Sequence, residues 1–253
     1  MQTTAILNLK GGVGKTTTVI HMAAILAKVK ARRVLVIDCD SQASLSEFLE
    51  AKREDGTLTD ALLNGDEYFA ATCIQKTPID GVDILAADDR LMELDLSSIK
   101  SKLIDPLTLR RRVELLAIRE EYDNILIDCP PAFNASSAAA LMASDDVVIP
   151  IKIDAFSLTG MANVMRQIFS CRTINPRLRV AGLLPTMWYK SEQIRQAGET
   201  LWKSEFRIFH HSRRSKAVDD LTFSREVLTS SRSGSEIDYR IFVDEWMGGA
   251  GSV

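Results

Sequence analysis

Apolar residues in this chain of 253 residues follow two alternating patterns. Short continuous apolar runs stand at 5–9, 33–38, 82–87, 124–128, 147–151 and 180–185. Such runs predict strands of a mostly parallel sheet that is covered on both faces. Helical spacing of apolar residues follows them at 19–27, 57–63, 107–121, 156–172 and 237–247. The alternation predicts a single α/β domain over 1–253, a twisted sheet with helices on both faces and a frayed tail at 248–253.

The first predicted strand and the first predicted helix are joined by Lys10-Gly11-Gly12-Val13-Gly14-Lys15-Thr16-Thr17. Strand, glycine-rich turn and helix form the context of a phosphate-binding loop. The glycines let backbone N–H groups approach a polyphosphate, and the positive end of the helix points to the same place. Lys15 supplies a charge for the β- and γ-phosphates, and the Thr16 hydroxyl is a ligand for Mg²⁺. The usual spelling would require glycine where Leu9 stands, and an extra lysine, Lys10, precedes the glycines.

Acidic residues end two of the predicted strands. Asp38 closes the second strand and is followed by Asp40, and Asp128 closes a later strand just before Pro130 and Pro131. Because ligands of open α/β sheets lie beyond the carboxyl ends of the strands, we expect these acids to face the phosphate loop. An aspartate at a strand tip beside such a loop is typical of Mg²⁺ organisation. The alternative is that Asp38 and Asp40 only cap the following helix.

The net charge of the chain limits how it could contact nucleic acid. The net charge of −3 excludes a surface that is basic overall, so any contact with nucleic acid requires a local patch. The most basic stretch is 186–220, which contains Lys190, Arg195, Lys203, Arg207, Arg213, Arg214 and Lys216. A solvated helix surface is the alternative interpretation of this stretch. For the run Arg110-Arg111-Arg112, with acids close behind it, we expect a solvated helix face.

The spacing of the cysteines and the lengths of the apolar runs bear on the cellular compartment in which we expect the protein. The four cysteines, Cys39, Cys73, Cys129 and Cys171, are scattered without a metal-binding spacing, and we expect buried thiols in a reducing cytoplasm. No apolar run approaches the roughly 18 residues that span a bilayer. No basic segment followed by an apolar one opens the chain, so no signal peptide is expected.

Several stretches together resemble one family. The segment 10–17 resembles the deviant Walker A box, and 37–42 and 125–131 resemble the two acidic boxes of the ParA/MinD superfamily of P-loop ATPases. Segments 149–160 and 184–187 resemble the later conserved strand ends of that family. The match is closer to ParA/Soj-type partition ATPases than to MinD, whose relatives end in an amphipathic membrane helix. The last six residues cannot form such a helix, so no membrane binding is expected.

The resemblance implies a Mg²⁺-dependent ATPase that is weak alone. It implies that Lys15 binds the β- and γ-phosphates, that Thr16 ligates Mg²⁺ and that Thr17 contacts the α-phosphate. Lys10 reaches across a homodimer to the partner's nucleotide, and Asp40 orients the attacking water. Asp38 and Asp128 hold Mg²⁺ through water. The nucleotide-binding residues implied in this way are Lys10, Gly11, Gly12, Val13, Gly14, Lys15, Thr16, Thr17, Thr186, Met187 and Arg213.

The resemblance also implies partners. An ATP-bound homodimer binds nonspecific double-stranded DNA on the nucleoid, and a ParB-like centromere-binding protein stimulates hydrolysis during plasmid or chromosome partition. The DNA contacts implied are Lys190, Arg195, Lys203, Arg207, Arg214 and Lys216. The segments 188–191 and 212–215 depart from the family pattern, because the first lacks an aspartate and an arginine and the second lacks a proline. The alternatives are a positioning ATPase for a non-DNA cargo, a MinD-like spatial regulator and a metabolic enzyme of the same superfamily.

Overall fold

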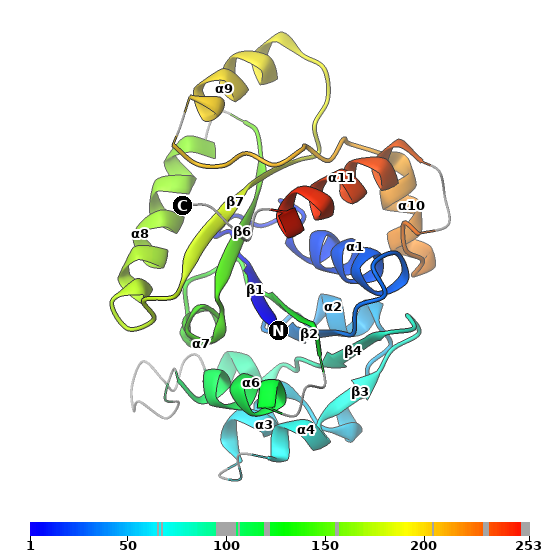
Figure 1. Ribbon diagram of the computed structural model, residues 1–253, viewed down its shortest axis with the longest axis vertical. Coiled ribbons are helices and arrows are strands. Elements are labelled where there is room, and N and C mark those ends of the chain that lie inside the picture. The colour runs from blue at the N-terminus through cyan, green and yellow to red at the C-terminus, as the bar shows by residue number, and fades with distance from the viewer. Residues whose placement is uncertain are drawn as a thin grey trace.

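One seven-stranded sheet, in the order β3-β4-β2-β5-β1-β6-β7, forms the centre of the protein (Figure 1). The computed structural model describes residues 1–64, 66, 68–94, 105, 107–118, 122–154, 157–203, 205–229 and 233–248. All strand pairs are parallel except β3 with β4. The strands are β1 Gln2–Ile6, β2 Val34–Asp38, β3 Ile74–Lys76, β4 Val82–Leu85, β5 Asn124–Asp128, β6 Asp146–Lys152 and β7 Arg179–Thr186.

Helices cover both faces of the sheet and divide the core in two (Figure 1). The helices are α1 Lys15–Lys28, α2 Ser44–Phe48, α3 Leu58–Leu63, α4 Phe69–Thr72, α6 Thr108–Ile118, α7 Ala135–Ala143, α8 Ser157–Arg172, α9 Glu192–Trp202, α10 Lys216–Ser224 and α11 Gly234–Gly248, with a 3₁₀ turn at Arg53–Asp55. Side chains of α1, α2 and α11 pack on one face. Side chains of α3, α6, α7 and α8 pack on the other. The predicted fold class is confirmed.

The predicted elements agree with the structure except where contacts between distant segments determine whether an element forms. The predicted helix at 57–63 begins at Leu58, and Thr57 and Asp60 form a reciprocal capping box at its start. The edge strand β3 was not predicted, because three residues carry no pattern of their own and gain their structure by pairing with β4. Helix α7 was also missed, because its alanines and serines are buried on nearly all sides and show no polar face. Parts of the predictions at 107–121, 156–172 and 248–253 lie outside the described residues.

The expectation of a solvated face for the arginine run of α6 is wrong for one residue. Arg110 pairs with Glu114, and Arg111 pairs with Asp105, both at exposed positions. Arg112 is instead buried, and its guanidinium donates to the carbonyl oxygen of Asn64 at 2.7 Å. The cause is a contact with a segment 48 residues away, which no local charge pattern reveals.

The segment 205–215, which we call the strap, runs along the outer edge of β7. The N–H of Leu183 donates to the carbonyl of Arg207, and the N–H of Phe209 donates back to the carbonyl of Leu183. Farther on, the N–H of Ser212 donates to the carbonyl of Pro185. The strap therefore pairs with the carboxyl half of the edge strand β7 through backbone hydrogen bonds. Among the described residues, no helix is both long and apolar enough to cross a bilayer.

Candidate nucleotide-binding site

The glycine-rich loop between β1 and α1 is held in left-handed backbone conformations. Gly12 has φ of 66° and Gly14 has φ of 85°, values that only glycine adopts without strain. Gly14 stands at the N-cap of α1 without a side-chain cap, so the first N–H groups of the helix remain available to a ligand. The side chain of Val13 is buried, so this residue offers only its backbone to the site.

Lys15 lies under the loop with its charge only weakly compensated. Its side chain is buried, and its Nζ donates to the carbonyl oxygen of Lys10 at 3.2 Å. Burial lowers the pKa of Lys15, and the nearby Asp128 carboxylate opposes that effect. A polyphosphate in the loop supplies the negative charge that this buried ammonium lacks.

A hydroxyl and two carboxylates meet at the carboxyl ends of β2 and β5. The Thr16 hydroxyl donates to Asp128 Oδ2 at 2.6 Å, and Asp38 stands beside Asp128 in the strand register. Burial and the charge of Asp38 raise the pKa of Asp128 well above its usual value. Asp128 Oδ1 is buried and has no hydrogen-bond partner among the described residues. An orphaned hard oxygen next to a hydroxyl and a second carboxylate suits Mg²⁺.

Asp38, at the end of β2, and Asp40, just beyond it, have different surroundings. Asp38 is fully buried, and its Oδ2 accepts from the backbone N–H of Ser46 at 2.9 Å and from the Ser46 hydroxyl at 2.7 Å. Burial raises the pKa of Asp38 to about 6 despite these hydrogen bonds. Asp38 therefore secures the start of α2, the structural role that we kept as the alternative. Asp40 donates its N–H to Asp38 Oδ1 and lines the phosphate half of the site.

Lys10 points away from the loop to which it belongs. Its ammonium forms an ion pair with Asp154, in the segment after β6. Both side chains are partly exposed, at 42% and 31%. The lysine is therefore not directed at the nucleotide site of its own chain. Nothing in the local sequence of either residue indicates this pair, because 144 positions separate the partners.

Two adjoining hollows form one groove over the loop. The phosphate half has a volume of about 490 Å³ and the base half about 570 Å³. Gly14, Thr17, Met187 and Thr222 line both halves. Thr186 closes the junction, because its hydroxyl donates to the carbonyl of Val13 at 2.8 Å. Except for Lys10, the predicted loop residues, Asp40, Thr186 and Met187 thus border or support one elongated groove that suits a nucleoside triphosphate.

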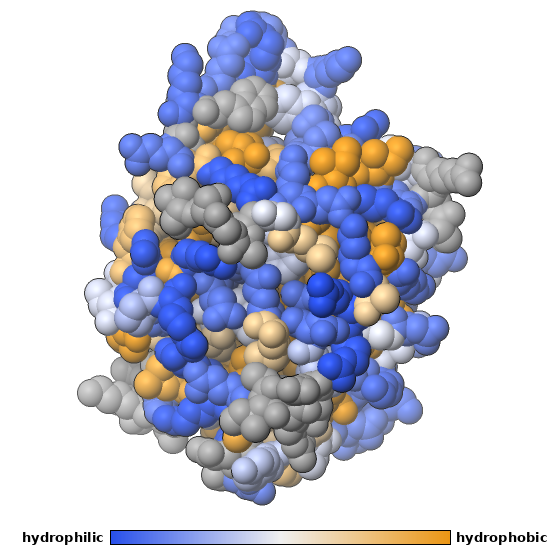
Figure 2. Space-filling view, in the orientation of Figure 1, coloured by the Kyte–Doolittle hydropathy of each residue, from blue (hydrophilic) through white to orange (hydrophobic). Residues whose placement is uncertain are grey.

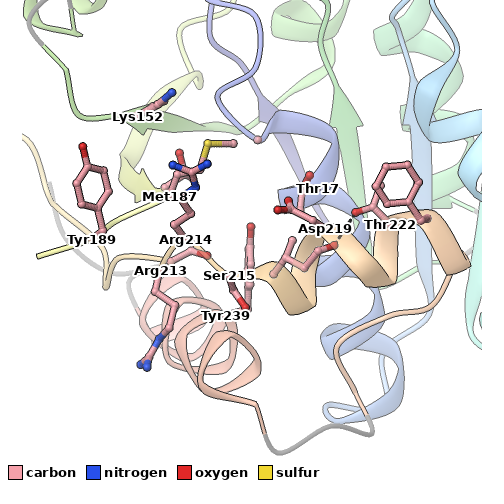
Figure 3. A pocket seen from close by; sticks show the side chains of 15 residues that line it. Thr17, Lys152, Met187, Tyr189, Arg213, Arg214, Ser215, Asp219, Thr222 and Tyr239 are labelled. Atoms are coloured by element: carbon pink, nitrogen blue, oxygen red, sulfur yellow. Dashed lines mark hydrogen bonds between the residues drawn. The ribbon is translucent and has the colours of Figure 1, made fainter.

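The base half differs from the prediction for Arg213. Figure 3 shows Arg214 directed toward Met187 and Arg213 directed away from the cavity. The Arg213 guanidinium donates to both oxygens of Asp238, at 2.7 and 2.8 Å. Burial raises the pKa of Asp238, but these hydrogen bonds outweigh it and keep the pKa below its usual value. The charge of Arg213 is therefore paired with Asp238 and holds the strap to α11, whereas Arg214 lines the cavity and is directed toward Met187.

Helix α10 contributes residues that the sequence did not reveal. Asp219 and Thr222 face Thr17 across the base half in Figure 3. At the end of the helix Arg225 lines the phosphate half and lies 3.6 Å from the carboxylate of Glu47. No motif marked these residues, because α10 reaches the loop only through the fold of the C-terminal third.

His21 on α1 is a buried histidine whose protonation affects the stability of the protein. Its ring packs in a tilted arrangement against Tyr239, with the ring centroids 5.1 Å apart, and its Nδ1 accepts the N–H of Leu228 at 3.4 Å. Burial lowers the pKa of His21 from 6.5 to about 4. Below pH 6.5 His21 is protonated in the unfolded chain but stays neutral in the folded protein. The free energy of unfolding therefore decreases as the pH falls from 6.5 toward 4.

We expect His21→Gln to remove this loss, because glutamine accepts the same N–H without titrating. The free energy of unfolding of the native protein should fall by an extra amount on the order of 3 kcal/mol between pH 6.5 and 4. Urea unfolding of both proteins across that range measures the difference between their free energies of unfolding. The buried aspartates titrate in both proteins, so their effects cancel in this difference. Parallel pH profiles would show that His21 carries a proton in the folded state.

The six predicted DNA-contact residues do not form one patch. Arg195 is neutralised on its own helix by Glu192 and Glu199. Arg207 donates to the carbonyl of Glu245 and borders a different cavity, near the amino end of β7. The other four predicted DNA contacts form no ion pair with a described residue: Lys190, Lys203, Arg214 and Lys216. Figure 2 shows a mostly hydrophilic surface over α9, the helix that Lys203 follows.

Comparison with known proteins decides the family. The sequence profile of a family described as "AAA domain" matches residues 1–180. The chain is 36% identical over 199 residues to the chromosome partitioning protein ParA of Caulobacter vibrioides, which covers 75% of this chain and 72% of that one. It is 33% identical over 204 residues to the chromosome-partitioning ATPase Soj of Thermus thermophilus, which covers 80% and 76%. The chain belongs to the ParA/Soj family of P-loop ATPases.

Solved structures agree with the fold of the ParA/Soj family. McdA of Cyanothece in the apo form has a TM-score of 0.83 at 23% identity, over 99% of this chain and all of that one. Cobyrinic acid a,c-diamide synthase from Mycobacterium smegmatis, solved with bound ADP and magnesium, has a TM-score of 0.79 at 26% identity, over 96% and 93%. The first likeness concerns the fold alone.

Proposed function

We propose that this chain is an ATP- and Mg²⁺-dependent partition ATPase that works as an ATP-bound homodimer on DNA. The observation that carries the proposal is the groove that Lys15, Thr16 and Asp40 line together, with the buried Asp128 hydrogen-bonded to Thr16. The names of its relatives, chromosome partitioning proteins, favour DNA as the cargo over other cargoes.

The chemistry assigned to the groove is phosphoryl transfer to water. Such reactions depend on positioning and on charge stabilisation rather than on covalent chemistry. Thr16 and Asp128 hold Mg²⁺, which when bound neutralises charge on the β- and γ-phosphates. Lys15 binds the same phosphates, and Asp40 orients the attacking water. Asp38, which we first assigned to Mg²⁺, is now assigned to positioning, because its oxygens already accept hydrogen bonds from Asp40 and Ser46.

Lys10 is assigned to the nucleotide of the partner subunit, as an arginine finger is in other NTPases. In one chain it is held by Asp154, and this ion pair must open before Lys10 can reach across an interface. An exposed ion pair is worth only about 0.2–1 kcal/mol, so it biases the subunit toward the resting state without locking it.

We expect Asp154→Asn to lower the ATP concentration for half-maximal dimerisation by about threefold, the equivalent of one exposed ion pair. Light scattering at increasing ATP concentration measures the shift. Asp89→Asn, which removes an equal charge from an exposed pair with Arg53, is the matched control and should change nothing. A weaker dimer in Asp154→Asn would mean that Asp154 acts within the dimer.

DNA binding is assigned to the four cations without ion pairs, Lys190, Lys203, Arg214 and Lys216. A dimer that places them on DNA phosphates releases counterions, so its affinity must fall steeply with salt. We expect DNA retention only with ATP and Mg²⁺, and a loss of about 10³-fold or more between roughly 50 and 200 mM salt.

Fluorescence anisotropy of a short labelled duplex, with a ParB-like partner added as activator, tests the proposed function. Lys190→Ala should reduce the salt slope, and Arg195→Ala, whose charge is already paired, serves as the control. If ATP produces neither dimers nor DNA retention, the chain is not a partition ATPase.

A further inference from the structure

A second cavity lies at the amino ends of β6 and β7, at the other end of the strands from the nucleotide groove. Its volume is about 390 Å³. Three arginines border it, and we call it the arginine cavity: Arg172 at the end of α8, Arg179 at the start of β7 and Arg207 on the strap. Neither the predicted motifs nor the proposed reaction uses this place.

None of the three guanidinium groups has a carboxylate partner among the described residues, although most other described arginines have one. Two of them lie over aromatic rings instead. The Arg172 guanidinium is 5.8 Å from the centroid of the Phe169 ring, and that of Arg207 is 4.9 Å from the centroid of the Phe209 ring. In a chain of net charge −3, three arginines without an ion pair to a described residue therefore gather at one cavity, although Arg207 also donates to the carbonyl of Glu245. Arginines placed in this way can pair with carboxylates or phosphates.

The acidic groups of the cavity do not cancel this charge. Asp146 is buried, its Oδ2 accepts from the Gln2 amide at 2.7 Å, and its Oδ1 has no hydrogen-bond partner among the described residues. Burial raises the pKa of Asp146 to about 6, and the charge of Arg179 opposes that shift. Glu205 is exposed and forms no ion pair with a described residue. Asp146 is still mostly ionised at pH 7, so the excess of positive charge at the cavity is that of three arginines over two acids.

The inner wall of the cavity is apolar and contains one unsatisfied donor. The wall is formed by Met165, Phe169, Phe206, Phe209 and Trp246. Trp246 is only 3% exposed, and its indole N–H has no hydrogen-bond partner among the described residues. A buried donor without a partner costs about 1–3 kcal/mol, and an acceptor on a bound molecule would recover that free energy.

These features distinguish between two kinds of anion. Backbone N–H groups commonly assist phosphate binding, but the N–H of Phe209, which lines the cavity, already donates to the carbonyl of Leu183. In duplex DNA the bases are stacked on one another inside the helix, so they are not available to fill an aromatic wall, and the oligonucleotide arm of the test below covers single strands. A peptide has all three complements: carboxylates for the arginines, a side chain for the wall and a carbonyl for the indole N–H.

We propose that the arginine cavity binds an acidic peptide segment of a partner protein, with one apolar or aromatic side chain inserted against Phe169 and Trp246. The flanking carboxylates of the peptide pair with Arg172, Arg179 and Arg207. The strap that borders this cavity through Phe206 and Arg207 continues to Arg214 in the base half of the nucleotide groove, so the peptide contacts a segment shared by both sites. This binding goes beyond the proposed function and requires no nucleotide.

The test uses the full chain without nucleotide and a set of short labelled peptides. Each peptide carries a central Leu, Phe or Trp between runs of Asp and Glu. Control peptides have either Ser in place of the central apolar residue or Lys in place of every acid. Fluorescence anisotropy gives the dissociation constants. With the Leu and Phe peptides, the ¹⁵N indole signals report the site directly, because the chain has 3 tryptophans and Trp246→Phe identifies the relevant signal.

We expect at least one acidic apolar peptide to bind and to shift the Trp246 indole signal, while both control sets bind at least tenfold more weakly. Arg172→Glu and Arg179→Glu should each raise the dissociation constant by about tenfold or more, because each removes a charge-assisted pair. Arg166→Glu is the matched control, since Arg166 is exposed on α8 and does not line the cavity.

Three results would overturn the proposal. The first is no binding by any acidic peptide at about 1 mM, a limit that corresponds to roughly 4 kcal/mol of binding free energy. The second is an equal loss of affinity in Arg166→Glu. The third is inorganic phosphate or a short oligonucleotide shifting the Trp246 signal where the peptides do not. Because nucleotide is absent throughout, Lys15→Ala should bind the peptides normally, so failure here leaves the proposed ATPase untouched.

Discussion

Replacing Lys15 with alanine is expected to weaken ATP binding by about 100-fold or more. The Lys15 ammonium is buried under the loop, and its only hydrogen bond among the described residues is to the carbonyl of Lys10. Two charge-assisted contacts to phosphate oxygens, at about 1.5–3 kcal/mol each, account for an effect of this size. Titration calorimetry with ATP and Mg²⁺ measures it.

The controls for this substitution come from the same helix and the same position. Lys28→Ala removes an exposed lysine from the last turn of α1 and should bind ATP as the native protein does. Lys15→Met keeps the side-chain stem and removes only the charge. Because burial already disfavours that charge, Lys15→Met should not melt below the native protein. Native ATP affinity in either Lys15 variant would contradict the assignment of Lys15 to the phosphates.

Much of the site was predictable because its parts are local in sequence. The glycines, Lys15 and Thr16 form one short run between a strand and a helix. The end of a parallel strand fixes where Asp128 and Asp38 must lie, since all such ends meet at one edge of the sheet. The register confirms that these two acids are neighbours. Pattern and topology alone therefore locate the phosphate half of the groove.

What the sequence did not reveal depends on partners that lie far apart in the chain. The pair of Lys10 with Asp154, the hold of Asp238 on Arg213 and the burial of Arg112 against the Asn64 carbonyl are contacts between distant segments. A charge pattern shows which residues are cations but not which of them are already paired. For that reason the predicted DNA contacts included Arg195, whose charge two glutamates neutralise.

Replacing Asp40 with alanine is expected to separate ATP binding from hydrolysis. Asp40 lines the phosphate half of the groove, and its carboxylate accepts only the N–H of Gln42 among the described residues, at 3.0 Å. It is therefore available to water and makes no contact that nucleotide binding requires. We expect hydrolysis to fall by about 10²–10⁴-fold, the range for loss of a positioned general base, with ATP affinity changed by less than about threefold.

The same variant tests whether hydrolysis controls assembly. If turnover dissolves the dimer, Asp40→Ala should stay dimeric and DNA-bound for as long as ATP is present, whereas the native protein returns to monomers when ATP is consumed. Asp40→Asn is the matched variant, because it keeps the hydrogen bond from Gln42 and removes the charge, and it should behave like Asp40→Ala. Phosphate release measures turnover and light scattering measures the dimer. Turnover at the native rate in both variants would remove Asp40 from its assigned role and would require another group to orient the water.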